Sequence, residues 1–186
     1  RLAGDWALVA RGLGKDGVQA LLIDAAAPRL TALVNDLLHA SHGPRWSVTI
    51  STTRAKKDKS GDKEVCDAIV HDQQARHERE RCRDVVAFSG GERTFLDEAL
   101  ALGLSLLGCE VAGLKEPVLI RDESGAALDR ERAPKYVAML RRAAEMAGAK
   151  HVLFVTHDPT LWALADSRVR VAGGKIEVDD EEEDPR

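Results

Sequence analysis

Two short apolar runs, separated by an amphipathic helix pattern, constrain the fold of this chain most strongly. The runs cover residues 118–121 and 151–156, and residues 133–147 between them carry apolar side chains at helical spacing. Pro134 is tolerated in that helix because it falls in the first turn. An alternation of helix and strand is typical of an α/β layer, so we predict an α/β fold with a partly parallel sheet and flanking helices.

Further helices are predicted before and after these segments in the sequence. Apolar residues recur at helical spacing over four segments, which cover residues 2–11, 18–39, 90–107 and 159–165. Pro28 favours the first turn of a helix, so we expect the second segment to form two pieces.

Alternating apolar and polar residues predict two hairpins. Strands over residues 45–52 and 64–71 would form a β-hairpin lobe, and strands over 169–171 and 175–178 would be joined through Gly173 and Gly174. Residues 73–84 are dense in charge, so we expect a loop or an exposed helix end. Residues 179–186 form an acidic tail that we expect to be disordered.

Composition excludes several classes of protein. The chain has 186 residues, of which 44% are apolar and 31% charged, as in an ordinary globular domain. Its net charge of −4 argues against a domain that is basic throughout. No apolar run approaches the roughly 18 residues of a membrane span, and no signal peptide opens the chain. Three scattered cysteines (Cys66, Cys82 and Cys109) are typical of reduced thiols, so we expect a cytoplasmic protein without a membrane partner.

The acidic pair Asp122 and Glu123 directly follows the first apolar run. Ligands of α/β sheets bind beyond the carboxyl ends of the strands, where these two carboxylates would lie. Asp122 could hold Mg²⁺ through water, and Glu123 could polarise an attacking water molecule. The alternative is a strand that merely ends in two acids.

The motif Ser89-Gly90-Gly91-Glu92 opens the helix at residue 90. Two glycines allow close approach of an anion, and a helix N-terminus offers free N–H groups and a positive dipole end. The alternative is an ordinary capping box, because Ser89 and Glu92 have that spacing.

His157 follows the second apolar run, where it could donate a hydrogen bond to a terminal phosphate. The alternative is a histidine in a polar loop beside Asp158. Asp129 lies just before the next helix, where it could cap that helix as well as serve the site.

Two other groups of side chains have simpler explanations. His39 and His42 are three residues apart, but no acid or cysteine cluster near them completes a metal site. A basic stretch could bind DNA phosphates or could be a solvated hairpin tip, because acidic residues are interleaved with Arg54, Lys56, Lys57, Lys59 and Lys63. The interleaved acids favour the solvated tip.

These motifs together resemble the C-terminal lobe of an ABC-type ATPase. Ser89-Gly90-Gly91-Glu92 is similar to the signature motif, residues 118–123 to Walker B, residues 124–129 to the D-loop, and His157 to the switch histidine. A phosphate-cradling G-x-x-x-x-G-K-[ST] loop is not in the chain, because Asp16 follows Lys15 where a hydroxyl belongs.

Within that superfamily the chain is most similar to the SMC-like SbcC group of DNA double-strand-break repair ATPases. Glu92 ends the signature as is usual in SMC-like proteins, and weaker similarity lies in residues 14–21, 33–38 and 164–168. The resemblance implies that residues 1–13 are the foot of a returning coiled-coil arm, that 14–178 form the C-terminal lobe, and that 179–186 are the tail. Because the chain begins at Arg1 inside a helical pattern, we interpret it as a piece of a longer protein.

The resemblance also implies a mechanism. Two heads would form a homodimer around two ATP molecules with Mg²⁺. The expected ATP-binding residues are Ser89, Gly90, Gly91, Glu92 and Asp129, and of these Ser89 and Gly91 would contact the terminal phosphate of the ATP held by the partner head. Asp122, Glu123 and His157 would serve the ATP of their own head. The expected partners are the chain's own N-terminal ATPase lobe, a second head, DNA and an SbcD-type nuclease, and this lobe alone would be inactive.

Two further functions fit the same motifs. One is an ATP-gated structural DNA clamp with little turnover, and the other is the nucleotide-binding lobe of a transporter. The hairpin lobe at residues 45–71 and Glu92 argue against the transporter. Arg121 departs from the family's usual apolar residue before the Asp, so we expect its side chain to face a partner or an acid.

Overall fold

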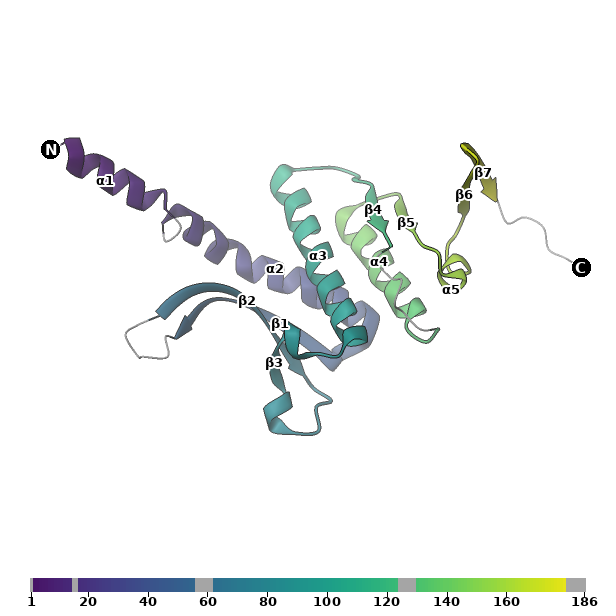
Figure 1. Ribbon diagram of the computed structural model, residues 1–186, viewed down its shortest axis with the longest axis horizontal. Coiled ribbons are helices and arrows are strands. Elements are labelled where there is room, and N and C mark those ends of the chain that lie inside the picture. The colour runs from purple at the N-terminus through teal and green to yellow at the C-terminus, as the bar shows by residue number, and fades with distance from the viewer. Residues whose placement is uncertain (1, 15–16, 56–61, 124–129, 180–186) are drawn as a thin grey trace, which may run out of the picture.

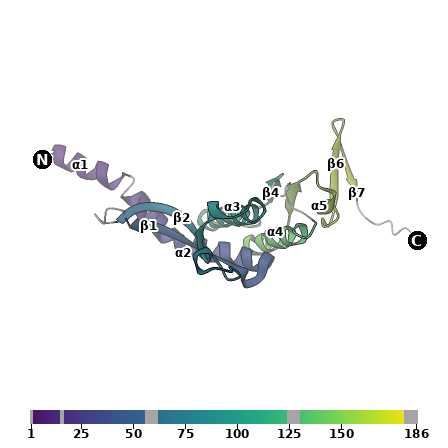
Figure 2. The same ribbon diagram turned by 60° about the horizontal axis from the view of Figure 1, so that its bottom comes forward.

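The computed structural model describes residues 2–14, 17–55, 62–123 and 130–179. Helices α1 (Leu2–Gly12) and α2 (Val18–His42) follow one another and lead from the N-terminus toward the centre of the molecule (Figure 1). Helices α3 (Gly90–Ala112) and α4 (Ala133–Ala147) lie beside the end of α2, and the strands flank this helical centre (Figures 1 and 2). Among the described residues, no helix is both long and apolar enough to cross a bilayer.

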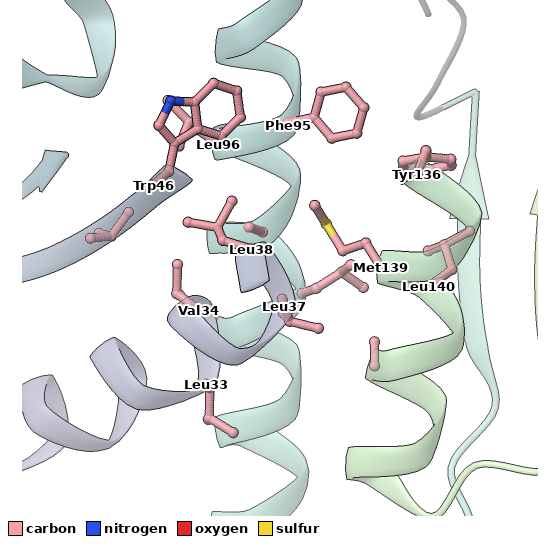
Figure 3. Close-up of a cluster of buried hydrophobic side chains, with 14 of the residues drawn as sticks. Leu33, Val34, Leu37, Leu38, Trp46, Phe95, Leu96, Tyr136, Met139 and Leu140 are labelled. Carbon is pink, nitrogen blue, oxygen red and sulfur yellow. The ribbon is translucent and has the colours of Figure 1, made fainter. Parts of the chain in front are cut away.

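The core is formed where α2, α3 and α4 meet. Figure 3 shows side chains of these helices that point toward one another, among them Leu37, Leu96 and Met139, which are fully buried. At the α2–α3 crossing, a Cβ added to Gly103 would lie 2.6 Å from Cγ2 of Val34. Glycine therefore lets these two helices approach more closely than any other residue would allow.

Helix α2 is continuous, so the prediction of two pieces divided at Pro28 was wrong. Proline removes one backbone hydrogen bond from the helix, but Pro28 is exposed and water can reach the carbonyl group that is left without a donor. Beyond Pro28 the helix packs into the core through residues such as Leu33, Val34 and Leu37. That packing holds the helix together where local propensity would interrupt it.

Strands β1 (Trp46–Ala55) and β2 (Asp62–Asp72) form the predicted antiparallel hairpin. The structure corrects the prediction of a loop or helix end over residues 73–84, because β3 (Cys82–Asp84) pairs with β2 as a third strand after the short 3₁₀-helix η2 (Glu78–Glu80). Two further 3₁₀-helices, η1 (Gly43–Arg45) and η3 (Val85–Ala87), flank the sheet. Strand β3 was not predicted because the segment is rich in charged residues and a strand of three residues shows almost no alternation of apolar and polar side chains.

Side chains of α2 bond to the outer edge of β1. Asn35 donates to the carbonyl oxygen of Val48 at 3.0 Å and accepts from its N–H at 2.6 Å. The Thr31 hydroxyl accepts from the N–H of Ile50 at 3.2 Å. Helix and sheet are thus joined by hydrogen bonds as well as by apolar packing.

Strands β4 (Leu119–Asp122) and β5 (Val152–Val155) pair in parallel, as the helix between them predicted. Although their sequences are apolar, the two strands are covered on only one of their two faces. Leu119 is buried, whereas Ile120 on the opposite face is 64% exposed and Leu153 is 51% exposed. Helix α4 packs near one face of the pair, and no described element covers the other.

The C-terminal segment ends in the predicted hairpin, β6 (Arg168–Ala172) and β7 (Lys175–Asp179). Gly173 and Gly174 both have positive φ, 56° and 74°, which a tight two-residue hairpin turn requires. Helix α5 (Pro159–Trp162) is shorter than the predicted 159–165. Asp179 is the last residue of β7 and not the first of a disordered tail, and residues 180–186 lie outside the described part of the chain.

Candidate nucleotide site

The carboxyl ends of β4 and β5 bring two of the predicted site residues into contact. The Glu123 N–H donates to the carbonyl oxygen of Val155 at 2.9 Å, which extends the parallel ladder by one residue. His157 follows β5, and its Nε2 lies 3.0 Å from Oε1 of Glu123. Both side chains are largely exposed, so this pair is open to a ligand.

Glu123 adopts an unusual backbone conformation. Its φ is 50°, in the left-handed region that non-glycine residues rarely occupy. Such a conformation costs about 1–3 kcal/mol and is most common at functional sites. It turns the chain immediately after β4, where the Glu123 carboxylate meets His157.

Asp122 ends β4 and is exposed at the same edge. Mg²⁺ binds hard oxygen ligands and is usually held by one or two carboxylates, substrate phosphates and water, so this donor set suits that ion. Within the described residues, no group of three or more His, Cys, Asp or Glu side chains could hold a metal by itself. His39 and His42 are therefore not part of such a group.

The Ser89–Glu92 motif opens α3 without forming a capping box. Ser89 is the N-cap residue, but its side chain makes no capping hydrogen bond to the backbone. Its hydroxyl donates to Oε2 of Glu92 at 2.9 Å, and Glu92 Oε1 accepts from Nη2 of Arg45 at 2.6 Å. The capping-box alternative is thus not what the structure contains, and the Ser89 side chain leaves the first-turn N–H groups of α3 uncapped.

Arg45 holds this motif against the β1–β2–β3 sheet. Its guanidinium lies 4.4 Å above the ring of Trp46, and its Nη2 lies 3.4 Å from Oδ2 of Asp72. Burial would raise the pKa of Glu92, but the hydrogen bonds from Ser89 and Arg45 outweigh it and lower the pKa. By sequence, Arg45 is only the start of a predicted strand, and no local pattern signals its contact with a residue 47 positions away.

Arg132, at the start of α4, lies directly against Gly91, the second glycine of the motif. A Cβ added to Gly91 would lie 1.8 Å from Nη1 of Arg132, whereas one added to Gly90 would meet nothing within 4 Å. Gly91 therefore gives the guanidinium room on the helix start. This contact also places the N-termini of α3 and α4 side by side (Figure 1).

His42 lies near the positively charged side chains of Arg45 and Arg132. Its ring lies tilted against Trp46 and meets Phe95 edge to face, with centroid distances of 4.5 and 4.4 Å. Burial, together with the positive charges of Lys135, Arg45 and Arg132, lowers the pKa of His42 to about 4. The histidine is thus a neutral part of the core.

Arg121 faces an acid, as the sequence analysis expected. Its Nε donates to Oε1 of Glu98 at 2.6 Å, and Glu98 is a buried residue of α3. Three other predicted features lie outside the described residues, namely Asp129, Lys15 and the 56–61 tip of the basic hairpin.

The fold can be compared with known proteins. No family model matches the sequence. One similar solved chain comes from work on ATP-driven dimerization and DNA-stimulated activation of SMC ATPases, with 14% identity, a TM-score of 0.59, and 86% of this chain and 88% of that chain covered. The SMC head domain from Thermotoga maritima is 18% identical, with a TM-score of 0.51 and coverage of 90% and 55%.

A third similar structure is the Smc head domain with an extended coiled coil, from Pyrococcus furiosus, bound to the C-terminal domain of ScpA. It is 14% identical, has a TM-score of 0.54, and aligns over 86% of this chain and 36% of that one. The chain has the fold of an SMC ATPase head lobe. It spans about a third to a half of the length of these last two head domains.

Proposed function

We propose that this chain is the C-terminal lobe of an ATP-hydrolysing, SMC-like head that dimerises around ATP and controls access to DNA. The contact between Glu123 and His157 at the carboxyl edge of β4 and β5 carries the proposal. It puts a carboxylate that could orient water within 3.0 Å of an imidazole that could bond to a phosphate. Asp122 at the same edge would hold Mg²⁺, which would neutralise developing phosphate charge.

The other half of the site would come from a second head. Uncapped N–H groups at the start of α3, beside Ser89 and Gly91, would bind the terminal phosphate of ATP held by the partner. Each lobe would thus serve two nucleotides, one through β4 and β5 and one through α3. Closing of the heads around ATP would then depend on both surfaces.

Two exposed apolar regions support the proposal that other parts of the protein pack against this lobe. The open face of β4 and β5 carries Ile120, Leu153 and Val155, which fits cover by an N-terminal ATPase lobe. Apolar side chains on α1, just after it and on the first turns of α2 are also exposed, and they fit the foot of a coiled-coil arm; they include Trp6, Val9, Leu13, Leu21 and Leu22.

The test is Glu123→Gln in the intact protein, with Glu116→Gln as the matched control. Both glutamates are exposed and have positive φ, but Glu116 pairs with Lys150 at 2.7 Å, away from the candidate site. Removing a group that orients the attacking water should lower kcat for ATP about 100-fold or more, and the control should leave it within twofold. Unchanged hydrolysis by Glu123→Gln would overturn the catalytic assignment.

The same variant separates the ATPase from a structural clamp. A clamp predicts negligible turnover by the wild type, together with ATP-dependent head dimerisation and persistent DNA retention by Glu123→Gln. Measurable wild-type turnover that Glu123→Gln abolishes favours the ATPase.

We further propose that the intact protein acts in DNA break repair with an SbcD-type nuclease. This assignment rests on Glu92 at the end of the signature and on the order of the motifs. The test is cleavage of linear DNA by the purified complex with and without ATP. Failure of the two proteins to co-elute would remove the nuclease from the proposal and leave the ATPase head in place.

A further inference from the structure

A buried ion pair joins the helix of the signature-like motif to the strand of the acidic pair. Glu98 lies on α3 and is only 8% exposed, and Arg121 is the residue directly before Asp122 on β4. Nε and Nη2 of Arg121 both lie 2.6 Å from Oε1 of Glu98. The hydroxyl of Tyr136, on α4, donates to the same oxygen at 3.4 Å. Three elements therefore meet at one carboxylate.

Strand geometry explains why Arg121 points inward. Successive side chains on a strand face opposite sides, so Leu119 and Arg121 face the helices while Ile120 and Asp122 face away. A charge at this inward position needs a partner, because an unpaired buried ion is costly. Burial alone would lower the pKa of Arg121, but the hydrogen bond and charge of Glu98 raise it.

The position of the Arg121–Glu98 ion pair indicates a role beyond stability. Glu98 lies two turns, or about 12 Å, along α3 from Gly90. Arg121 is covalently next to Asp122 and two residues before Glu123. Any shift of α3 along or about its axis is therefore transmitted to the carboxyl end of β4. Apolar contact at this point would permit sliding, whereas two short hydrogen bonds to one oxygen fix direction and distance.

We propose that Arg121 and Glu98 are positioning residues that couple the signature-like end of α3 to the Asp122–Glu123 edge. The inference rests on the proposed function, in which α3 contacts the partner's nucleotide and β4 serves the lobe's own nucleotide. Engagement of α3 by the partner would set the position of Glu123, so hydrolysis would follow correct docking of the heads.

The experiment removes both charges together, because a single substitution would leave one ion buried and unpaired. The variant is Glu98→Gln with Arg121→Met in the intact protein. Two quantities are measured: kcat for ATP, and the Kd of ATP-driven dimerisation in the Glu123→Gln background. We expect kcat to fall at least tenfold while that Kd changes less than threefold, because each half of the site stays intact but their connection is lost.

The control removes another arginine–carboxylate pair, which joins other elements and is more exposed. Arg142 on α4 bonds to both oxygens of Asp36 on α2, at 2.9 and 2.7 Å. Asp36→Asn with Arg142→Met should leave kcat within twofold. Arg121→Lys, which keeps the charge but offers a single donor group, should fold like the wild type and lower kcat to an intermediate value.

Three outcomes overturn the coupling. They are a kcat within twofold of the wild type for the double variant, a parallel loss of dimerisation and hydrolysis, and a wild-type kcat for Arg121→Lys if the double variant does not fold. None of these touches the proposed function, which fails separately if Glu123→Gln still hydrolyses ATP at the wild-type rate.

Discussion

Single residues at the start of α3 differ sharply in the room around them. Gly90 faces open space, whereas Gly91 lies under the guanidinium of Arg132. Both residues are glycines in the first turn of the same helix, so only their surroundings distinguish them. The sequence alone cannot make this distinction, because Arg132 comes from another element.

We predict that Gly91→Ala weakens ATP-driven head dimerisation about tenfold or more, while Gly90→Ala changes it less than threefold. A methyl group at Gly91 must displace Arg132 and would stand where the phosphate approaches. The displaced group is the end of a flexible side chain, so the thermal stability of the two variants should be similar. Equal dimerisation constants, measured by analytical ultracentrifugation, would contradict the prediction.

His42 predicts a pH dependence of stability. Its pKa is lowered from 6.5 to about 4 in the fold, so the unfolded chain binds more protons between these values. Stability is fully present above pH 6.5 and is lost as the pH falls toward 4. The loss should be about 1–2 kcal/mol, because the ring is only partly buried and solvent reduces the effect.

The measurement is urea unfolding of the intact protein at pH 7 and pH 4.5. His42→Phe removes the titrating group and should flatten the pH dependence, whereas His39→Gln, at an exposed position of the same helix, should leave it unchanged. If the free energy of unfolding fell equally between pH 7 and pH 4.5 in the wild type and in His42→Phe, this explanation would be contradicted.

At the scale of elements, the helices and strands that have a clear local sequence pattern were predicted correctly. The helix over Ala133–Ala147, the parallel pairing of β4 with β5 and the Gly173–Gly174 hairpin were all confirmed. The prediction failed where packing outweighed local preference, as in the continuous α2 through Pro28, and where a strand was too short to alternate, as in β3.

The candidate site was accessible to sequence reasoning only in part. Motif order identified Glu123 and His157, which the structure brings into contact. Arg45 and Glu98 were missed, because each acts through a partner more than 20 residues away. One signal was present: the arginine directly before Asp122 predicted that its side chain faces a partner or an acid, although it did not say which residue.

The α2–α3 crossing provides a prediction about stability. Gly103→Ala would bring a Cβ to 2.6 Å from Val34, so overpacking should cost about 1–3 kcal/mol. Gly108→Ala lies on the same helix with nothing within 4 Å and should stabilise the protein by about 0.5–1 kcal/mol. Urea unfolding measures both, and effects of the same sign would contradict the crossing geometry.

At the scale of the whole molecule, apolar side chains are unevenly distributed. A single core lies among α2, α3 and α4, while the open face of β4 and β5 is apolar and uncovered by any described element. This exposed face is where the proposed N-terminal lobe would pack.

We predict that Val155→Thr destabilises the intact protein, whereas Val111→Thr does not. Both substitutions keep the shape of the side chain and replace a methyl group with a hydroxyl, and both valines are exposed here, Val111 at 83%. If an N-terminal lobe covers Val155, a buried hydroxyl should cost about 1–3 kcal/mol. Equal melting temperatures for the two variants would contradict cover of this face.

The bonds from Asn35 and Thr31 to β1 also bear on self-association. An open sheet edge is a template on which a strand of another chain can add, and such additions lead to aggregates or to captured peptides. Here the outward N–H and carbonyl groups of Val48 and the N–H of Ile50 are already bonded to a helix. Strand addition is therefore blocked along this stretch of β1, so any assembly of the molecule must use other surfaces.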